Sequence, residues 1–188
     1  MTVVEIFSRI GTQLVKGMMV HSQLMNAYLF LGLDGYAACH EYHYLSESKS
    51  YIQVCKYATD HLGMLVNTDN SIQDIPDIIP QSWFANDREK VDTKTRLQAM
   101  EEALTTWIEW EENAKKLYED LYFELEKKDV PAAEYVKEMI VDVEEEIVYA
   151  RKERLVKRSM AFDIVSIMEE QKECERSFKK KIRKAFNI

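Results

Sequence analysis

Apolar residues recur every three to four positions along most of the chain, and this period is typical of amphipathic α-helices. Three segments interrupt the period, at residues 32–35, 67–95 and 126–131. The pattern predicts helices over residues 3–32, about 36–66, about 95–125 and from Pro131 onward, and a fifth helix, or a continuation of the fourth, over about 160–186. An all-α bundle is therefore the expected fold class.

Each predicted helix has one apolar side that we expect to face the bundle core. The first helix carries this stripe from Phe7 to Leu31, and the third carries it from Leu97 to Leu125. In the second helix the expected apolar side comprises Tyr44, Leu45, Ile52, Cys55, Leu62 and Val66. Helices with one apolar side bury it by packing against each other.

The long segment between the second and third helices, residues 67–95, shows little period and contains Pro76 and Pro80. Such a length fits a bundle in which these two helices run parallel, because the chain must then return along the whole bundle. A linker between domains is the alternative, although the apolar residues of the segment are unlike a solvated linker. We expect an up-down four-helix bundle at 1–160. A C-terminal helix at 161–188 is expected to pack on the bundle or at a subunit interface.

Composition and charge favour helical structure and indicate where in the cell we expect the protein. The chain has only five glycines and three prolines, as helical bundles do. The formal net charge of −8 argues against non-specific binding to nucleic acid. Cys39, Cys55 and Cys174 show no CxxC spacing, which favours free thiols in a reducing cytoplasm. No signal peptide is recognised and the longest apolar run is too short to cross a bilayer, so we expect no membrane partner.

Polar residues interrupt the apolar stripes near the middle of the helices. His21, Glu111 and Glu146 lie within the stripes of the first, third and fourth helices. In the second helix Glu47 lies at the edge of the apolar side, and His43 precedes it by one turn. A buried carboxylate without a partner costs several kcal/mol, so these groups must be paired, protonated or bound to a cation. Four packed helices would bring one such group each to a common level, as in di-iron and di-manganese bundles.

Four segments resemble the helix motifs of the ferritin-like superfamily, near ferritin and bacterioferritin. They are HSQLMNAYLFL, YLSESKSY, EWEENAKKL and VDVEEEIVYA, and the resemblance covers about residues 3–155. His21 stands where the family has a glutamate. Ser50 stands where one ExxH motif has its histidine, and Tyr149 stands there in the other motif if Glu146 is the matching glutamate. The resemblance implies iron or manganese, with iron oxidation, iron handling or oxidase chemistry. It also implies a homo-oligomer, because ferritins assemble into shells; a dimer is the alternative.

The predicted metal ligands are His21, His43, Glu47, Glu111 and Glu146, with Tyr149 beside them. We expect a mononuclear site of two histidines and a carboxylate, closed by Glu111 or Glu146. His40 and His43 are displaced from Glu47 by about 6 to 10 Å along the helix, so all three cannot bind one ion. His43 and Glu47, at a spacing of four, can share an ion.

The same residues also have interpretations without a metal. His40, His43 and Glu47 would then form a hydrogen-bonded face at a helix or subunit contact, and His21 would be a core histidine. The acidic runs around Glu111 and Glu146 would be solvated surface. The alternative function is a metal-free relative of ferritin that acts as an interaction or assembly module. The sequence leaves open whether the protein is an enzyme, since it carries no recognisable nucleophile motif or phosphate loop.

Overall fold

The computed structural model describes residues 1–69, 91–161 and 163–187. The helices are α1 (Val3–Leu31), α2 (Asp34–Leu62), α3 (Thr93–Glu126), α4 (Val130–Ser159) and α5 (Ile164–Phe186). The predicted all-α class is confirmed. The second helix ends earlier than predicted, because Gly63 takes a left-handed conformation with φ of 63° and stops it. Within the described ranges, no helix is long and apolar enough to cross a membrane.

Polar side chains cap the starts of α1, α3, α4 and α5. Thr2 N donates to the Glu5 carboxylate at 2.6 Å, and Glu5 N donates to the Thr2 hydroxyl at 3.2 Å, which makes a capping box. Asp92, Asp129 and Asp163 each accept a hydrogen bond from the backbone N–H three residues on. These caps define where each helix begins.

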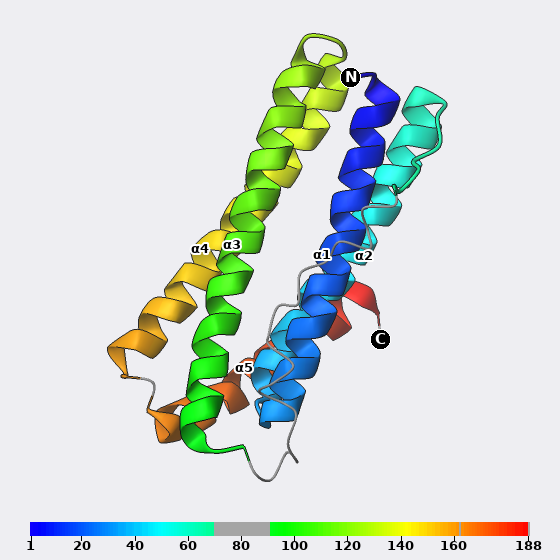
Figure 1. Ribbon diagram of the computed structural model, residues 1–188. Helices are drawn as coiled ribbons and strands as arrows, with labels where there is room; N and C mark the ends of the chain where they lie inside the picture. The colour runs from blue at the N-terminus through cyan, green and yellow to red at the C-terminus, as the bar shows by residue number, and fades with distance from the viewer. Residues whose placement is uncertain (70–90, 162, 188) are drawn as a thin grey trace.

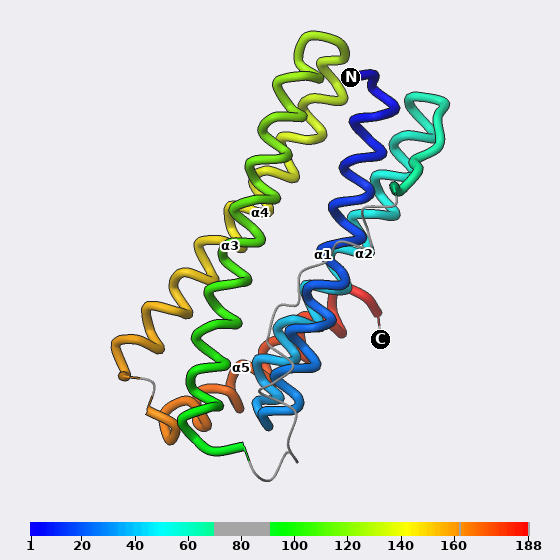
Figure 2. Tube along the Cα trace, in the orientation of Figure 1, coloured from blue at the N-terminus to red at the C-terminus, as the bar shows by residue number. Residues whose placement is uncertain are grey.

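The helices form two antiparallel pairs, α1 with α2 and α3 with α4, as Figures 1 and 2 show. α2 and α3 run in the same direction, as predicted (Figure 1). The predicted crossover prolines, Pro76 and Pro80, lie outside the described residues. α5 begins near the end of α4 and packs against α2.

The core consists of two apolar clusters that follow each other along the bundle. One cluster contains residues 6–14 of α1 with the second half of α3. The other contains residues 20–31 of α1 with the first half of α3 and part of α5. His43, Glu111 and Glu146 lie on their helices between the residues of the two clusters. A polar level therefore separates two apolar blocks.

The inward side of α2 differs from the prediction. Ile52 is 51% exposed and Tyr44 is 38% exposed, so the predicted apolar side is wrong at these positions. The buried residues of α2 are Gly35, Tyr36, Ala37, Ala38, Cys39, His40, His43, Val54 and Ala58. α2 carries few large apolar residues, so the spacing of its apolar residues was a poor guide to the side that faces the core. Small residues and histidines occupy that side instead.

α5 packs against the start of α2 at very short range. A Cβ atom at Gly35 would lie 1.9 Å from the backbone oxygen of Gln171, so a larger residue would force the helices apart. Gly35 N donates to the Gln171 side chain at 3.1 Å, and the Tyr36 hydroxyl donates to Glu170 at 3.2 Å. These contacts place α5 on the bundle, while its use as a subunit interface stays a prediction.

A buried lysine joins α4 to α5. Lys157 is 0% exposed, and its Nζ lies 2.8 Å from Glu153 and 2.7 Å from Glu170. The same ammonium lies 4.9 Å from the centroid of the Tyr36 ring on α2. Sequence analysis missed Lys157, because its spacing of four from Glu153 is equally typical of exposed pairs and Glu170 belongs to another helix.

Replacing Lys157 by Met should lower the free energy of unfolding by about 3–5 kcal/mol, the cost of removing one member of a buried ion pair. Methionine keeps most of the volume, whereas the Glu153 and Glu170 carboxylates lose their shared partner. Urea unfolding followed by circular dichroism measures the change. Lys152→Met, exposed on the same helix, is the control and should change stability by less than about 0.5 kcal/mol. Equal effects of the two substitutions would contradict a role for the buried lysine.

Candidate metal centre

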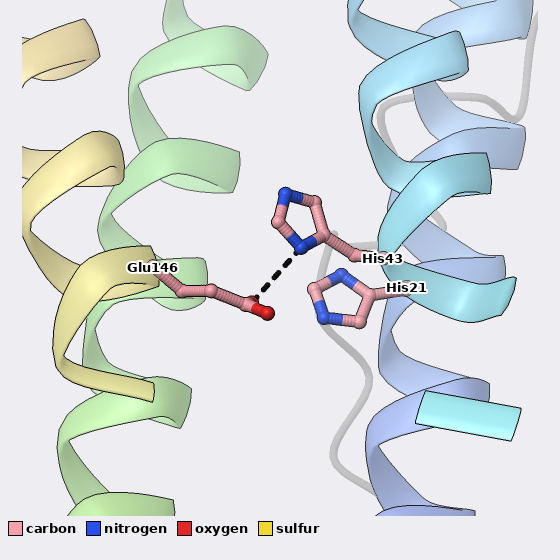
Figure 3. A group of neighbouring side chains, drawn as sticks. All are labelled: His21, His43 and Glu146. Carbon is pink, nitrogen blue, oxygen red and sulfur yellow. Dashed lines mark ion pairs between the residues drawn. The ribbon is translucent and has the colours of Figure 1, made fainter. Parts of the chain in front are cut away.

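His21 of α1, His43 of α2 and Glu146 of α4 meet inside the bundle (Figure 3). One ligand atom from each lies within 4.8 Å of the other two. Donors at about 2.0–2.2 Å from one ion lie at most about 4.4 Å apart, so small side-chain movements would bring all three to an ion. Figure 3 shows the two rings facing the carboxylate across the space between the α1/α2 pair and α4. Three of the five predicted ligands therefore lie together.

Several buried polar atoms at this meeting point have no hydrogen-bond partner among the described residues. They are His21 Nε2, both ring nitrogens of His43 and Glu146 Oε2. His43 Nδ1 lies 3.0 Å from Glu146 Oε2, and His21 Nε2 lies 3.4 Å from Glu111 Oε1, but neither contact has hydrogen-bond geometry. Buried polar atoms without partners are rare in proteins. A cation between the rings and the carboxylate would satisfy most of them, so the residues present fit a metal ion.

Glu111 lies beside this group. It is 1% exposed, and its Oε1 accepts a hydrogen bond from Trp107 Nε1 at 3.2 Å. Burial and then the Glu146 carboxylate raise the pKa of Glu111, while His21 opposes the rise. The expectation that Glu111 faces inward is confirmed. Its role as a ligand stays a prediction.

His40 contacts the far side of the His21 ring. It is 2% exposed, and its Nδ1 lies 3.1 Å from Nδ1 of His21, so one nitrogen donates and the other accepts. Burial lowers the pKa of His40, and His21 and His43 lower it further, so His40 is neutral. When His21 donates, its Nε2 carries a lone pair and can bind a metal. Ligand histidines are commonly oriented in this way through their second nitrogen.

Trp107 of α3 packs against all three of these histidine rings. The distances from its ring centroid are 4.7 Å to His40, 5.1 Å to His43 and 6.2 Å to His21. Sequence analysis did not identify Trp107 or His40 as parts of the site. The spacing of four between Trp107 and Glu111 was a signal for their bond. The contact between His40 and His21 joins two helices, so spacing alone does not reveal it.

Glu47 does not join the three converging residues. Its carboxylate lies against Gly17 of α1, where a Cβ atom would approach Glu47 Oε1 to 2.5 Å. Among the residues that the structure describes, Glu47 makes no hydrogen bond or ion pair. Burial raises the pKa of Glu47, and the carboxylates of Glu111 and Glu146 raise it further. Its role as a metal ligand stays a prediction.

A cavity of about 480 Å³ opens beside the site, between α2, α4 and α5. His43 and Glu146 form part of its wall, and so does Glu47. Tyr149, predicted to lie beside the ligands, also lines the cavity, and its ring centroid lies 6.0 Å from that of Trp107. The cavity therefore gives two of the three converging residues, His43 and Glu146, access to a space larger than an ion.

His43 and Glu146 strongly affect each other's titration. Burial alone would lower the pKa of His43, but the Glu146 carboxylate, with a smaller effect of Cys39, more than offsets this, and the pKa lies well above its ordinary value. Burial alone would raise the pKa of Glu146, but the His43 cation lowers it, with a smaller effect of His21. Without a metal, the pair is therefore charged over a wide pH range.

In chelator-treated protein, Glu146→Gln should lower the free energy of unfolding by about 1–3 kcal/mol near pH 6, because His43 loses its buried partner. The pKa of His43 is raised on folding, so its share of the stability is complete below its ordinary value of 6.5 and is lost as pH rises through the raised value. The pKa of Glu146 is lowered, so its share is present above 4.5 and is lost as pH falls through the lowered value.

The difference between wild type and variant should therefore be largest between the ordinary pKa values of 4.5 and 6.5 and should shrink on both sides. Urea unfolding at a series of pH values measures it. A difference that does not change with pH would show that His43 and Glu146 do not form a charged pair.

Comparison with known proteins identifies the fold. No protein-family model and no curated protein matches this sequence. An engineered closed form of the Archaeoglobus fulgidus ferritin is similar in structure, with a TM-score of 0.73 and 14% identity over 93% of this chain and 96% of that chain. A humanized archaeal ferritin gives a TM-score of 0.72 and 16% identity over 92% of this chain and 94% of that chain. At this identity the likeness concerns the fold alone, and it confirms the predicted resemblance: the chain has the ferritin-like fold.

Proposed function

We propose that the protein binds one divalent transition-metal ion, iron or manganese, between His21, His43 and Glu146. The observation that carries the proposal is the set of buried nitrogen and oxygen atoms that converge there without hydrogen bonds. Buried polar groups are normally paired, and an unpaired set from three different helices requires a common partner. A cation is the partner that both imidazole and carboxylate accept.

The donor set favours iron chemistry. Two histidines and one carboxylate with open positions are typical of non-haem iron(II) oxygenases, and imidazole with carboxylate also suits manganese. When bound, the ion would supply oxygen and redox chemistry. The two similar solved structures are ferritins, which supports iron over other metals. Iron oxidation, iron handling or an oxidase activity is the proposed chemistry.

One ion, rather than two, fits the residues at the polar level. Ser50 and Tyr149 stand where the ferritin-like motifs have histidine, and both line the cavity. Neutral hydroxyl groups are weaker ligands for iron and manganese than imidazole. Glu47 lies outside the group of three residues whose ligand atoms converge. The chain therefore keeps enough donors for a single ion.

The surrounding residues would hold the ligands in place. With His21 as the donor, His40 would accept the hydrogen bond between the two Nδ1 atoms, which would leave His21 Nε2 for the ion. Trp107 restricts rotation of the rings. Glu111 Oε1, which lies 3.4 Å from His21 Nε2, adds negative charge close to the ion or holds a proton, in keeping with its raised pKa.

A metal-free bundle that serves as an interaction or assembly module is the second candidate function. The observation that favours it is the contact of 3.0 Å between His43 Nδ1 and Glu146 Oε2, which closes the site by charge without an ion. The loss of both ExxH histidines agrees with it. Homo-oligomer formation, as a dimer or a shell, and a cytoplasmic location belong to both candidates and stay predictions.

Protein purified without chelator and loaded with Fe²⁺ or Mn²⁺ should contain close to one ion per chain by elemental analysis. His21→Ala, His43→Ala and Glu146→Ala should each weaken the affinity by more than about a hundredfold, because the loss of a ligand costs more than the loss of a supporting residue. His61→Ala, which removes an exposed histidine, is the control and should bind like wild type. A content below about one tenth of an ion per chain after loading would support the metal-free candidate instead.

His40→Phe should weaken metal affinity by about 10- to 100-fold while the fold is kept, which is the usual effect of losing a residue that orients a ligand. Phenylalanine preserves the ring that packs against Trp107 but removes the nitrogen that faces His21. Isothermal titration with Mn²⁺ measures the affinity, and circular dichroism measures the helix content. An unchanged affinity would show that His21 needs no hydrogen-bond partner at Nδ1.

A further inference from the structure

We propose that the cavity beside the metal centre binds a small organic cation, an amine with an aromatic or apolar body, and that Glu47 binds its ammonium group. A role of the cavity as a substrate pocket depends on the proposed metal centre, because His43 and Glu146 belong to both. The amine site itself depends only on the residues that line the cavity.

The size of the cavity points to an organic ligand. Its volume of about 480 Å³ lies within the range of about 300–1,000 Å³ that is typical of small-molecule pockets. A water molecule takes up about 30 Å³ in the liquid, so an ion with a few waters would leave most of this space unfilled. A route for ions alone would not need this volume.

The charge of the wall selects a cation. Glu47 of α2 lines the cavity together with Asp142, Glu145 and Glu146 of α4, and against these four acids the cationic side chains among the described lining residues are Lys181 and, when protonated, His43. Burial raises the pKa of both Glu47 and Asp142, and neighbouring carboxylates raise it further. A positive charge in the cavity would relieve this repulsion.

Aromatic residues form much of the remaining wall. Tyr42, Tyr118, Tyr149 and Phe178 line the cavity, and ring faces attract ammonium groups. The Lys181 ammonium already lies 4.6 Å from the centroid of Phe178 and 5.8 Å from that of Tyr42. The wall on the α5 side therefore holds an ammonium group of the chain itself, and a ligand amine would find similar rings deeper in the cavity.

Glu47 is one of the wall's carboxylates without a partner among the described residues, and it is the one on α2. Glu146 contacts His43, whereas Glu47 has no hydrogen bond or ion pair among the described residues. Glu47 lies against Gly17, on the side of the cavity formed by α1 and α2. His43, which is 6% exposed and lines the same cavity, has no hydrogen bond at either nitrogen among the described residues. The Glu47 carboxylate and the Nε2 atom of His43 are thus without partners among the described residues, as at a ligand site.

Three probes with the same phenol ring but different head groups test the proposal. They are tyramine, which is a cation, 4-ethylphenol, which is neutral, and 3-(4-hydroxyphenyl)propionate, which is an anion. Calorimetric titration of the full chain should give tyramine an affinity at least about tenfold above the other two, which corresponds to about 1.4 kcal/mol. The titrations are done on metal-loaded and on chelator-treated protein.

Two variants assign the selectivity to Glu47. Glu47→Gln should reduce tyramine binding by about tenfold or more, to the level of 4-ethylphenol, since it removes the charge but keeps the shape. Gly17→Ala keeps the charge but displaces the carboxylate, because its methyl group would lie 2.5 Å from Glu47 Oε1. This variant should therefore weaken the binding of tyramine and leave the binding of the other two probes unchanged. Glu41→Gln, at an exposed glutamate of the same helix, is the control and should bind all three probes like wild type.

Equal affinities for the three probes, or no binding of tyramine, would overturn the proposal. So would an unchanged tyramine affinity in Glu47→Gln. If elemental analysis shows that Glu47→Gln loses bound metal, Glu47 is a metal ligand and its assignment to the amine is wrong. Tyramine selectivity in chelator-treated protein would survive the failure of the metal centre, and metal binding without tyramine binding would leave the metal centre intact, so the two proposals fail separately.

Discussion

The structure depends on one constraint, which is the burial of polar groups from four helices between two apolar clusters. His21, His43 and Glu111 are almost fully buried at this level, and Glu146 is 24% exposed. Removing such groups from water costs several kcal/mol each unless they find partners. Hydrophobic packing on either side holds them there, because moving the level would also move the apolar residues above and below it. The partners that these groups find therefore decide what the protein can do.

The partners are distributed unevenly. Glu111 has the Trp107 N–H, and His21 has His40, so these two are fixed from behind by residues of the bundle. The front of the group, where His21, His43 and Glu146 face each other, has charge contacts but no hydrogen bonds among the described residues. Rigid support behind and unmet bonding capacity in front are what a metal site requires. A bundle stabilised for its own sake would more often place apolar side chains at this level.

Much of the fold and part of the site could be predicted from the sequence. α1 and α3 carry large apolar residues on one side, so His21 and Glu111 stand out as exceptions, and both are buried. α2 has small residues and histidines on its inward side, so its period gave the wrong face at Ile52. Contacts such as the one between His21 and His40 join different helices, so they depend on how far each helix is shifted along the bundle. The spacing of apolar residues along one helix does not reveal this shift.

The ferritin-like fold and the donor set point to related but different chemistry. A di-iron bundle of this kind uses carboxylates from all four helices and a histidine from two of them. Here α1 contributes His21, and Ser50 and Tyr149 stand at the histidine positions, so negative charge and ligand number at the centre both fall. In the proposed single-ion site fewer donors would leave coordination positions open, and the cavity of about 480 Å³ lies beside His43 and Glu146. If the proposed centre holds one ion, Glu47, which lines the cavity and lies outside the three converging residues, is available to the proposed amine.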